Sequence, residues 1–266
     1  PPAYFQIGNE HYGVHETAHM TGAMYVAALK AFVPPLRAAY PNSRIIALGQ
    51  IRSAGLRPEW RTPWLVPVLE EAAEHVDILS LNRYKGQWNE TPLDLQVNAV
   101  ESVPKMEHDL RELIHDRRAR GLKQKVALTE WNYWLYASHW DGQDFREPGD
   151  AQHGFFVAGM LAMFARLGAD MEVANYYHLV QGMALFRRRG ADVEETCIAD
   201  VFRLYRPAFP GAYLPLDTAS PRLGRTEAAL DALALENGGG TWLFLANRSP
   251  DASLRVALDG FPSGTP

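Results

Sequence analysis

The chain has 266 residues, of which 47% are hydrophobic, so it carries enough apolar material for one large domain or slightly more. A formal net charge of −5 and a sequence pI of about 6.0 exclude the broad basic surface expected of a nucleic-acid or anionic-membrane partner. The single cysteine excludes an internal disulfide and a cysteine-based zinc cage, and no apolar run reaches the ~20 residues that cross a bilayer.

Short apolar runs alternate with helical patterns over residues 1–206. The predicted strands begin at Tyr4 and span 44–48, 76–81, 125–128 and 171–177. The predicted helices span 21–39, 64–74, 103–118, 151–167 and 198–205, and Pro34-Pro35 is expected to kink or shorten the first of them. This alternation predicts a parallel α/β sheet. Five strand units are three fewer than a (β/α)₈ TIM barrel contains, so we expect a partial barrel made of its strands 4 to 8.

The composition changes after residue 206. Proline and glycine punctuate residues 207–224, and alternating runs follow at 228–236, 241–247 and 254–258 with turn residues between them. These runs predict antiparallel strands. We therefore expect a second domain over 207–266, which is part of an antiparallel β-sandwich.

Two of the predicted barrel strands lead to a glutamate, Glu10 in the first and Glu130 in the fourth. A carboxylate at the C-terminal end of a parallel strand points into the mouth of a barrel, where barrel enzymes keep their catalytic groups. Retaining glycoside hydrolysis needs two such carboxylates, an acid/base and a nucleophile, about 5–5.5 Å apart. The alternative is that each glutamate only caps the helix that follows its strand.

Three motifs at these strand ends resemble those of the family-51 glycoside hydrolases, the α-L-arabinofuranosidases. Gly8-Asn9-Glu10 matches the end of the family's fourth barrel strand, and Glu130-Trp131-Asn132 matches the end of the seventh. The segment 77–84 is similar to the Asp-x-x-Ser-x-His-x-Tyr pattern of the sixth strand, with Asn82 in place of the histidine. The resemblance spans nearly the whole chain and implies a family member that lacks the first three barrel units.

The resemblance implies a role for each matched residue. Glu10 would be the acid/base and Glu130 the nucleophile, while Asn9 would bind the sugar 2-hydroxyl and Tyr84 would hold Glu130 in line. Aromatic neighbours would also exclude water from the carboxylates. The other substrate-binding residues that the resemblance implies are Asn82, Trp131 and His178.

The implied activity is exo-acting release of terminal α-L-arabinofuranosyl residues with retention of configuration. The substrates would be arabinose-containing oligosaccharides or polysaccharides, with β-xylosides as the second choice. No metal or cofactor is required, and neither a nucleic-acid nor a membrane partner is expected. The sequence is compatible with a homo-oligomer of the full-length protein. It does not indicate whether the protein is cytoplasmic or secreted. This fragment alone is expected to be poorly active or inactive.

Two other functions have support in the sequence. His15-Glu16-Thr17-Ala18-His19 is a literal H-E-x-x-H, which on a helix would hold zinc for a metallopeptidase, although Tyr25 occupies the position of a third metzincin histidine. We expect polar loop residues here instead. A partial barrel also suits a non-catalytic carbohydrate-binding remnant, because its open sheet edges and exposed core favour association.

Overall fold

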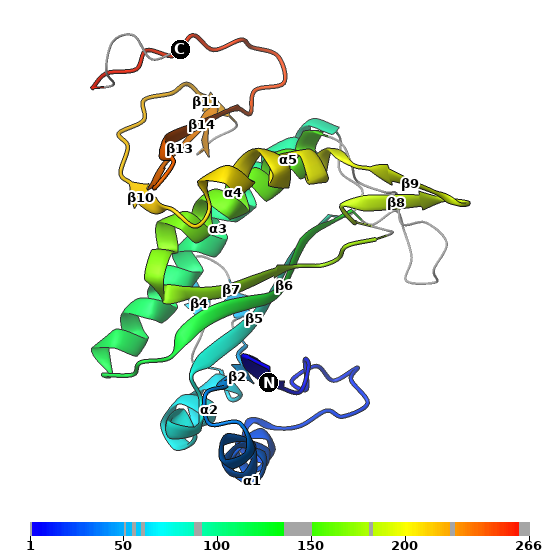
Figure 1. Ribbon diagram of the computed structural model, residues 1–266, viewed down its shortest axis with the longest axis vertical. Coiled ribbons are helices and arrows are strands. Elements are labelled where there is room, and N and C mark those ends of the chain that lie inside the picture. Colours follow the sequence, from blue (N-terminus) through cyan, green and yellow to red (C-terminus); the bar gives the residue numbers. More distant parts are fainter. Residues whose placement is uncertain are drawn as a thin grey trace.

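The computed structural model describes residues 2–50, 52–54, 57–59, 62–87, 92–135, 151–180, 183–223 and 227–260. Its centre is a five-stranded parallel sheet with the order β1-β2-β5-β6-β7, which curls into part of a barrel (Figure 1). These strands are β1 (Tyr4–Ile7), β2 (Arg44–Leu48), β5 (Ile78–Gln87), β6 (Lys125–Leu135) and β7 (Met171–Tyr176). The parallel order confirms the predicted α/β fold class.

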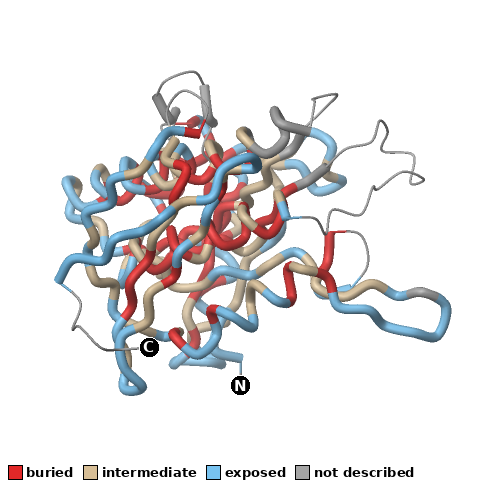
Figure 2. Tube along the Cα trace, turned by 90° about the horizontal axis from the view of Figure 1, so that it is seen from above, coloured by how far each residue is buried: buried red, intermediate tan, exposed pale blue. Residues whose placement is uncertain are grey.

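Helices connect the strands and cover one face of the sheet. They are α1 (Gly22–Ala39), α2 (Leu65–Glu71), α3 (Pro92–Ala119), α4 (Ala151–Leu167) and α5 (Cys197–Tyr205), with short 3₁₀ turns η1 (Ala73–His75), η2 (Gly168–Asp170) and η3 (Arg206–Ala208). Leu48, Leu79 and Leu128 point from the sheet toward these helices. Figure 2 shows the buried residues concentrated between the two layers. Burial of this apolar face supplies most of the driving force for the fold.

The opposite face of the sheet is the inner face of the partial barrel. Ile46, Ile78 and Ala127 form a small buried cluster on it, because strand residues alternate between the two faces. Nearer the N-terminal strand ends, Glu172 on β7 accepts hydrogen bonds from Arg44 on β2 and from Lys125 Nζ on β6, the latter at 2.7 Å. Burial alone would raise the pKa of Glu172, but these two cations hold it below its usual value. This polar cluster ties the curled strands together.

The C-terminal strands pack on the outer helices. β10 (Ala212–Leu214), β13 (Leu230–Asn237) and β14 (Gly240–Asn247) form an antiparallel sheet, and β11 (Arg222–Leu223) pairs with β12 (Glu227–Ala228). Leu233, Leu235 and Phe244 pack against small residues of α4, and the rings of Tyr205 and Phe244 stack 4.2 Å apart. The predicted strands at 228–236 and 241–247 are therefore confirmed. The domain boundary at 206/207 falls within η3 and stays a prediction.

Several predicted elements differ from the structure. The segment 254–258 forms no strand, and α1 continues through Pro34-Pro35, both of which are exposed. Between β7 and α5, where the sequence analysis gives no element, the chain forms a hairpin of β8 (Phe186–Arg189) with β9 (Asp192–Glu195). A second short hairpin pairs β3 (Arg52–Ala54) with β4 (Arg57–Glu59).

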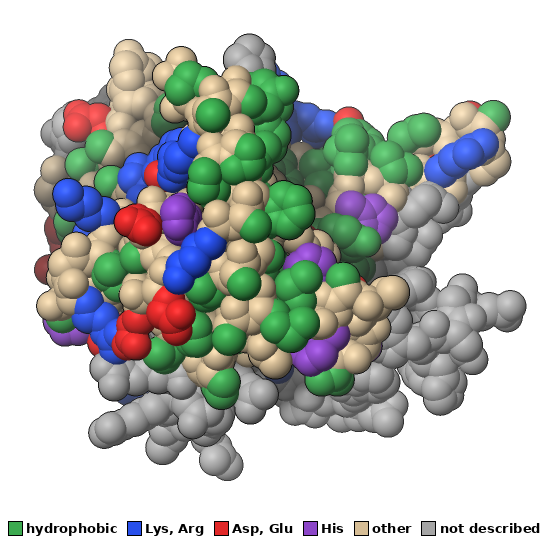
Figure 3. Space-filling model, turned by 90° about the horizontal axis from the view of Figure 1, so that it is seen from below, with side chains coloured by type: hydrophobic (Ala, Val, Ile, Leu, Met, Phe, Trp, Pro, Cys, Tyr) green, Lys and Arg blue, Asp and Glu red, His purple; other side chains and the backbone are tan. Residues whose placement is uncertain are grey.

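The face that α1 presents to solvent is partly apolar. Met24 and Phe32 are 54% and 61% exposed, and Figure 3 shows hydrophobic side chains among charged and histidine side chains on the face seen from below. Within the described residues, no helix combines the length and the apolar character needed to span a membrane.

Candidate active site

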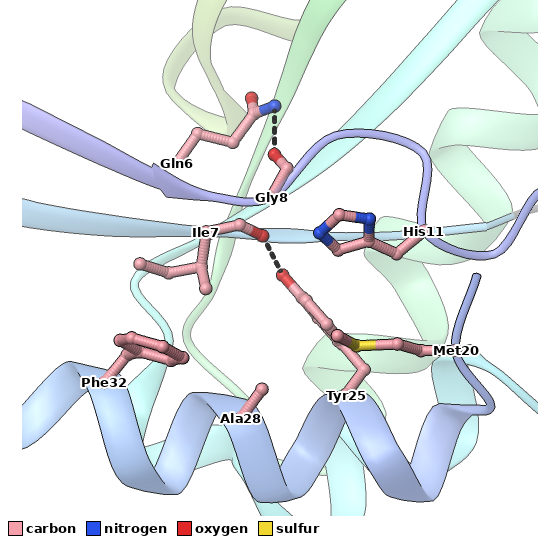
Figure 4. Close-up of a pocket in the computed structure, with 8 residues that line it drawn as sticks. All are labelled: Gln6, Ile7, Gly8, His11, Met20, Tyr25, Ala28 and Phe32. Carbon is pink, nitrogen blue, oxygen red and sulfur yellow. Dashed lines mark hydrogen bonds between the residues drawn. The ribbon is translucent and has the colours of Figure 1, made fainter. Parts of the chain in front are cut away.

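The turn after β1 places Glu10 at the mouth of the partial barrel. Gly8 and Glu10 both have positive φ values, +82° and +47°, so the chain bends sharply within three residues. A Cβ added at Gly8 would lie 2.3 Å from Nε2 of His11, and Figure 4 shows this imidazole beside Gly8 at the end of β1. Gly8 is therefore needed both for its backbone conformation and for the space it leaves.

We expect Gly8→Ala to destabilise the protein more than Gly121→Ala does. Gly121 has a similar φ of +70° but nothing within 4 Å of an added Cβ, so its substitution costs only the backbone term of about 1–2 kcal/mol. At Gly8 the clash with His11 adds to that term. Urea unfolding of the two variants measures the difference, and equal losses would show that the close approach at Gly8 has no energetic weight.

Glu10 is connected to the neighbouring strands by hydrogen bonds. Its Oε1 accepts from Asn82 Nδ2 at 2.7 Å and from the Tyr12 hydroxyl at 3.3 Å. The side-chain oxygen of Asn82 in turn accepts from the Thr129 hydroxyl at 3.1 Å. A chain of contacts thus runs from Glu10 across β5 to the residue that precedes Glu130.

Glu130 faces the same side of the sheet because β6 contains a β-bulge. β6 advances by three residues where each neighbouring strand advances by two, between Ala127 and Glu130 against β5 and between Leu128 and Trp131 against β7. Ala127 lies on the inner face, so strict alternation would have turned Glu130 outward, but the extra residue restores it to the inner face. There its Oε2 accepts from the Tyr84 hydroxyl at 2.8 Å.

The two glutamates act on one another electrostatically. Burial is the largest cause that raises the pKa of Glu130, and the negative charges of Glu10 and Glu16 raise it further. Hydrogen bonds to the side chains of Tyr84 and Asn9 oppose the rise. The structure thus brings Asn9, Asn82 and Tyr84 to the two carboxylates. Their roles in binding and catalysis stay predictions.

We expect Tyr84→Phe to move the acidic limb of the activity profile to higher pH. The Tyr84 hydrogen bond lowers the pKa of Glu130, so its loss raises that pKa, and the carboxylate predicted to be the nucleophile is then protonated at a higher pH. Loss of a hydrogen bond to a charged group predicts about a 10–100-fold decrease in kcat/KM. Tyr177→Phe is the matched control, because the Tyr177 ring packs on Tyr84 at 6.0 Å while the hydrogen bond to Glu130 comes from Tyr84. An unmoved acidic limb in Tyr84→Phe would contradict this role.

The prediction that Trp131 contacts substrate is wrong. Trp131 is 1% exposed, and its ring packs against Phe164, Tyr176 and Phe202 in the core under α4 and α5. The bulge that turns Glu130 inward turns the next residue outward. The aromatic groups beside the carboxylates are instead Tyr12 and Tyr84.

His178 lies just beyond the end of β7 and is half-buried. Its ring lies 4.7 Å from that of Tyr177, and it is Tyr177 that reaches the Tyr84 ring. A substrate contact of His178 stays a prediction.

A buried polar network under this mouth was not predicted from the sequence. Asn132, completely buried, donates to the carbonyl oxygens of Tyr177 and Met183 and accepts from His153 Nε2 at 2.7 Å. Burial lowers the pKa of His153 to about 3, so the imidazole is neutral and donates through Nε2. The signals that could have found the network were a histidine in the otherwise apolar helix 151–167 and an asparagine next to the Glu-Trp pair.

We expect Asn132→Ala to destabilise the protein by about 2–4 kcal/mol, because it removes the donor to the Tyr177 carbonyl oxygen and the acceptor of the buried His153 imidazole. Asn175→Ala, the same change at an exposed position of β7, should stay within about 0.5 kcal/mol of the wild type. Urea unfolding compares them, and similar values would mean that the network is not needed for stability.

The H-E-x-x-H segment does not form a zinc-peptidase helix. Residues 11–20 form turns, with Gly13 N donating to Glu10 O at 2.7 Å and Met20 N donating to His11 O at 2.8 Å. His19 Nδ1 lies 3.1 Å from the carbonyl oxygen of Gly13 instead of beside His15. The two histidines therefore do not share a helix face as that motif requires.

A cavity of about 280 Å³ lies next to the turn, between β1 and α1 (Figure 4). The Tyr25 hydroxyl donates to the carbonyl oxygen of Ile7 at 2.7 Å across one wall. The lining residues are Gln6, Ile7, Gly8, His11, Met20, Tyr25, Ala28 and Phe32. Neither glutamate lines it, so this cavity is separate from the candidate active site.

No protein-family model matches the sequence, and comparison with curated proteins gives no match. Solved structures do match. The family-51 α-L-arabinofuranosidase of Bifidobacterium longum has a TM-score of 0.75 at 19% identity over 91% of this chain and 52% of its own. The family-51 arabinofuranosidase of Xanthomonas axonopodis pv. citri has a TM-score of 0.75 at 20% identity over 94% and 52%.

The arabinose complex of the Thermotoga maritima α-L-arabinofuranosidase has a TM-score of 0.70 at 23% identity, over 91% of this chain and 51% of its own. The chain therefore spans about half the length of each of these structures. At these identities the likeness shows the fold, which is part of a (β/α)₈ barrel followed by antiparallel strands.

Proposed function

We propose that this chain is part of a retaining glycoside hydrolase that releases terminal α-L-arabinofuranosyl residues from arabinose-containing oligosaccharides or polysaccharides. The observation that carries the proposal is the pair Glu10 and Glu130, held at one barrel mouth and joined through Asn82 and Thr129. The similar solved structures include arabinofuranosidases, one of them in complex with arabinose.

In the proposed first step, Glu130 attacks the anomeric carbon while Glu10 donates its proton to the departing oxygen. The glycosidic C–O bond breaks and a glycosyl–Glu130 ester forms. In the second step, Glu10 takes a proton from water, which attacks the same carbon and releases Glu130. Two inversions give net retention, and the water supplies the electron pair that displaces Glu130 and the proton that restores Glu10.

The neighbouring residues have positioning and binding roles in this scheme. Tyr84 and Asn9 hydrogen-bond Glu130 and oppose the rise of its pKa, which favours the ionised nucleophile. Asn9 would also reach the sugar 2-hydroxyl, and Asn82 holds the Glu10 carboxylate. His178 would contact the sugar from the end of β7.

The activity is proposed for a full-length protein in which further barrel units complete the wall, because this chain covers about half of the similar structures. The partner is a carbohydrate, and the chemistry requires no cofactor. A carbohydrate-binding remnant is the second candidate, and its distinguishing property would be sugar binding without turnover.

The test is hydrolysis of chromogenic α-L-arabinofuranoside and β-D-xyloside by the full-length protein, with the first-formed product followed by ¹H NMR. We expect faster hydrolysis of the arabinofuranoside and a product of retained configuration. An inverted product would contradict the double displacement, and binding without hydrolysis would favour the remnant.

A further inference from the structure

We propose that Glu10, His15 and Glu16 form a binding site for one Zn²⁺ ion at the mouth of the candidate active site. Each residue offers one ligand atom, and these three atoms lie within 4.8 Å of one another. His15 Nε2 and Glu16 Oε1 are 3.3 Å apart. In a tetrahedral site with zinc bonds of ~2.0–2.2 Å, neighbouring ligand atoms lie roughly 3.4 Å apart, so this pair already has the required spacing.

The backbone of the turn holds the three residues together. Gly13 N donates to Glu10 O at 2.7 Å, and Glu16 N donates to Gly13 O at 3.1 Å, which folds His15 and Glu16 back toward Glu10. A Cβ at Gly13 would lie 2.8 Å from the His15 ring and 3.3 Å from Glu16 Cγ. The His15 and Glu16 side chains therefore lie over a residue that must be small.

The charges around this turn favour a cation. Glu10 and Glu16 both act on Glu130 with negative charge, so three carboxylates lie within interaction range of one another. Oε1 of Glu10 is occupied by Asn82 and Tyr12, and coordination through its second oxygen would leave both of those hydrogen bonds in place. The His15 and Glu16 side chains are 72% and 34% exposed, which leaves an entry path from solvent.

The ligand set selects the class of ion. An imidazole nitrogen with two carboxylate oxygens suits zinc and related first-row metals, whereas Ca²⁺ and Mg²⁺ prefer oxygen ligands alone. Three protein ligands leave a fourth position for water.

The consequence for activity rests on the proposed function. A zinc ion on Glu10 would occupy the carboxylate that must carry the proton for the departing oxygen. Bound zinc would therefore inhibit hydrolysis, and a chelator would restore it.

Zinc binding by the full-length protein can be measured in competition with a chromogenic chelator at neutral pH. The variants are His15→Gln, Glu16→Gln and, as a matched control from the same motif, His19→Gln. We expect one ion per chain in the wild type and in His19→Gln, and at least about tenfold weaker binding in the other two. All three side chains lie on the exposed turn, and circular dichroism verifies folding.

The site would be overturned if the wild type showed no saturable zinc binding at one ion per chain. It would also be overturned if His15→Gln kept the wild-type zinc affinity, or if His19→Gln lost as much affinity as His15→Gln. In parallel, zinc should inhibit arabinofuranoside hydrolysis by the wild type, and His15→Gln should need at least about tenfold more zinc. If the full-length protein does not hydrolyse the arabinofuranoside, the proposed function fails, while the chelator competition still decides the zinc site.

Discussion

Glu130→Ala in the full-length protein should lower kcat by at least about 10⁴-fold, the scale seen when the nucleophile of a covalent mechanism is removed. Glu130 lies on the inner face of β6 with its Oε2 held by Tyr84, where it can attack a sugar bound at the barrel mouth. Azide should fit the space left by the side chain and attack the substrate directly. The expected product is an arabinofuranosyl azide of inverted configuration, identified by NMR.

Glu74→Ala is the control for this experiment. Glu74 lies in η1, away from the barrel mouth, with its side chain 81% exposed, so its removal should leave kcat unchanged. Wild-type turnover in Glu130→Ala, or rescue by azide with retained configuration, would remove Glu130 from the role of nucleophile.

Glu10→Ala should slow hydrolysis by about 10²–10⁴-fold, the usual contribution of a general acid/base, and the loss should depend on the leaving group. Substrates with poor leaving groups need the proton from Glu10 and should lose most. Dinitrophenyl arabinofuranoside should still form the glycosyl-enzyme, because its leaving group departs without protonation. Azide should then attack that intermediate and give a product of retained configuration.

Equal loss of activity for substrates with good and with poor leaving groups would contradict the acid/base assignment of Glu10.

The strand and helix pattern of the barrel could be predicted from sequence because its apolar runs are long and regular. The helix 151–167 and the strand 44–48 match the structure residue for residue. The helix has apolar residues throughout its length, and the strand is a short continuous apolar run that is buried on both faces. The hairpin of β8 and β9 was missed because Arg187-Arg188-Arg189 has no alternation of polar and apolar residues.

The candidate site was partly predictable for a different reason. Glu10 and Glu130 follow from their places at the C-terminal ends of parallel strands, which converge in any barrel. Asn9, Asn82 and Tyr84 follow only from the family resemblance of the motifs around them. The direction of Trp131 did not follow, because a one-residue bulge reverses which side chains face inward and leaves no mark in the sequence.

The convergence of Glu10 with His15 and Glu16 depends on turns that periodicity does not describe. The H-E-x-x-H motif requires a shared helix face for the two histidines, whereas the sequence indicated a polar loop and the structure folds the segment over Gly13. A local motif such as H-E-x-x-H indicates a function only when the chain adopts the backbone conformation that the motif requires.

The central claim is that Glu130 becomes covalently attached to the sugar while Glu10 handles the proton. Mass spectrometry of Glu10→Ala, quenched during turnover of dinitrophenyl arabinofuranoside, tests it most directly, because that variant should form the intermediate quickly and hydrolyse it slowly. The account predicts a mass increase of one pentosyl unit, located by peptide mapping on Glu130. A pentosyl adduct on another residue, or steady turnover with unmodified protein, would contradict it.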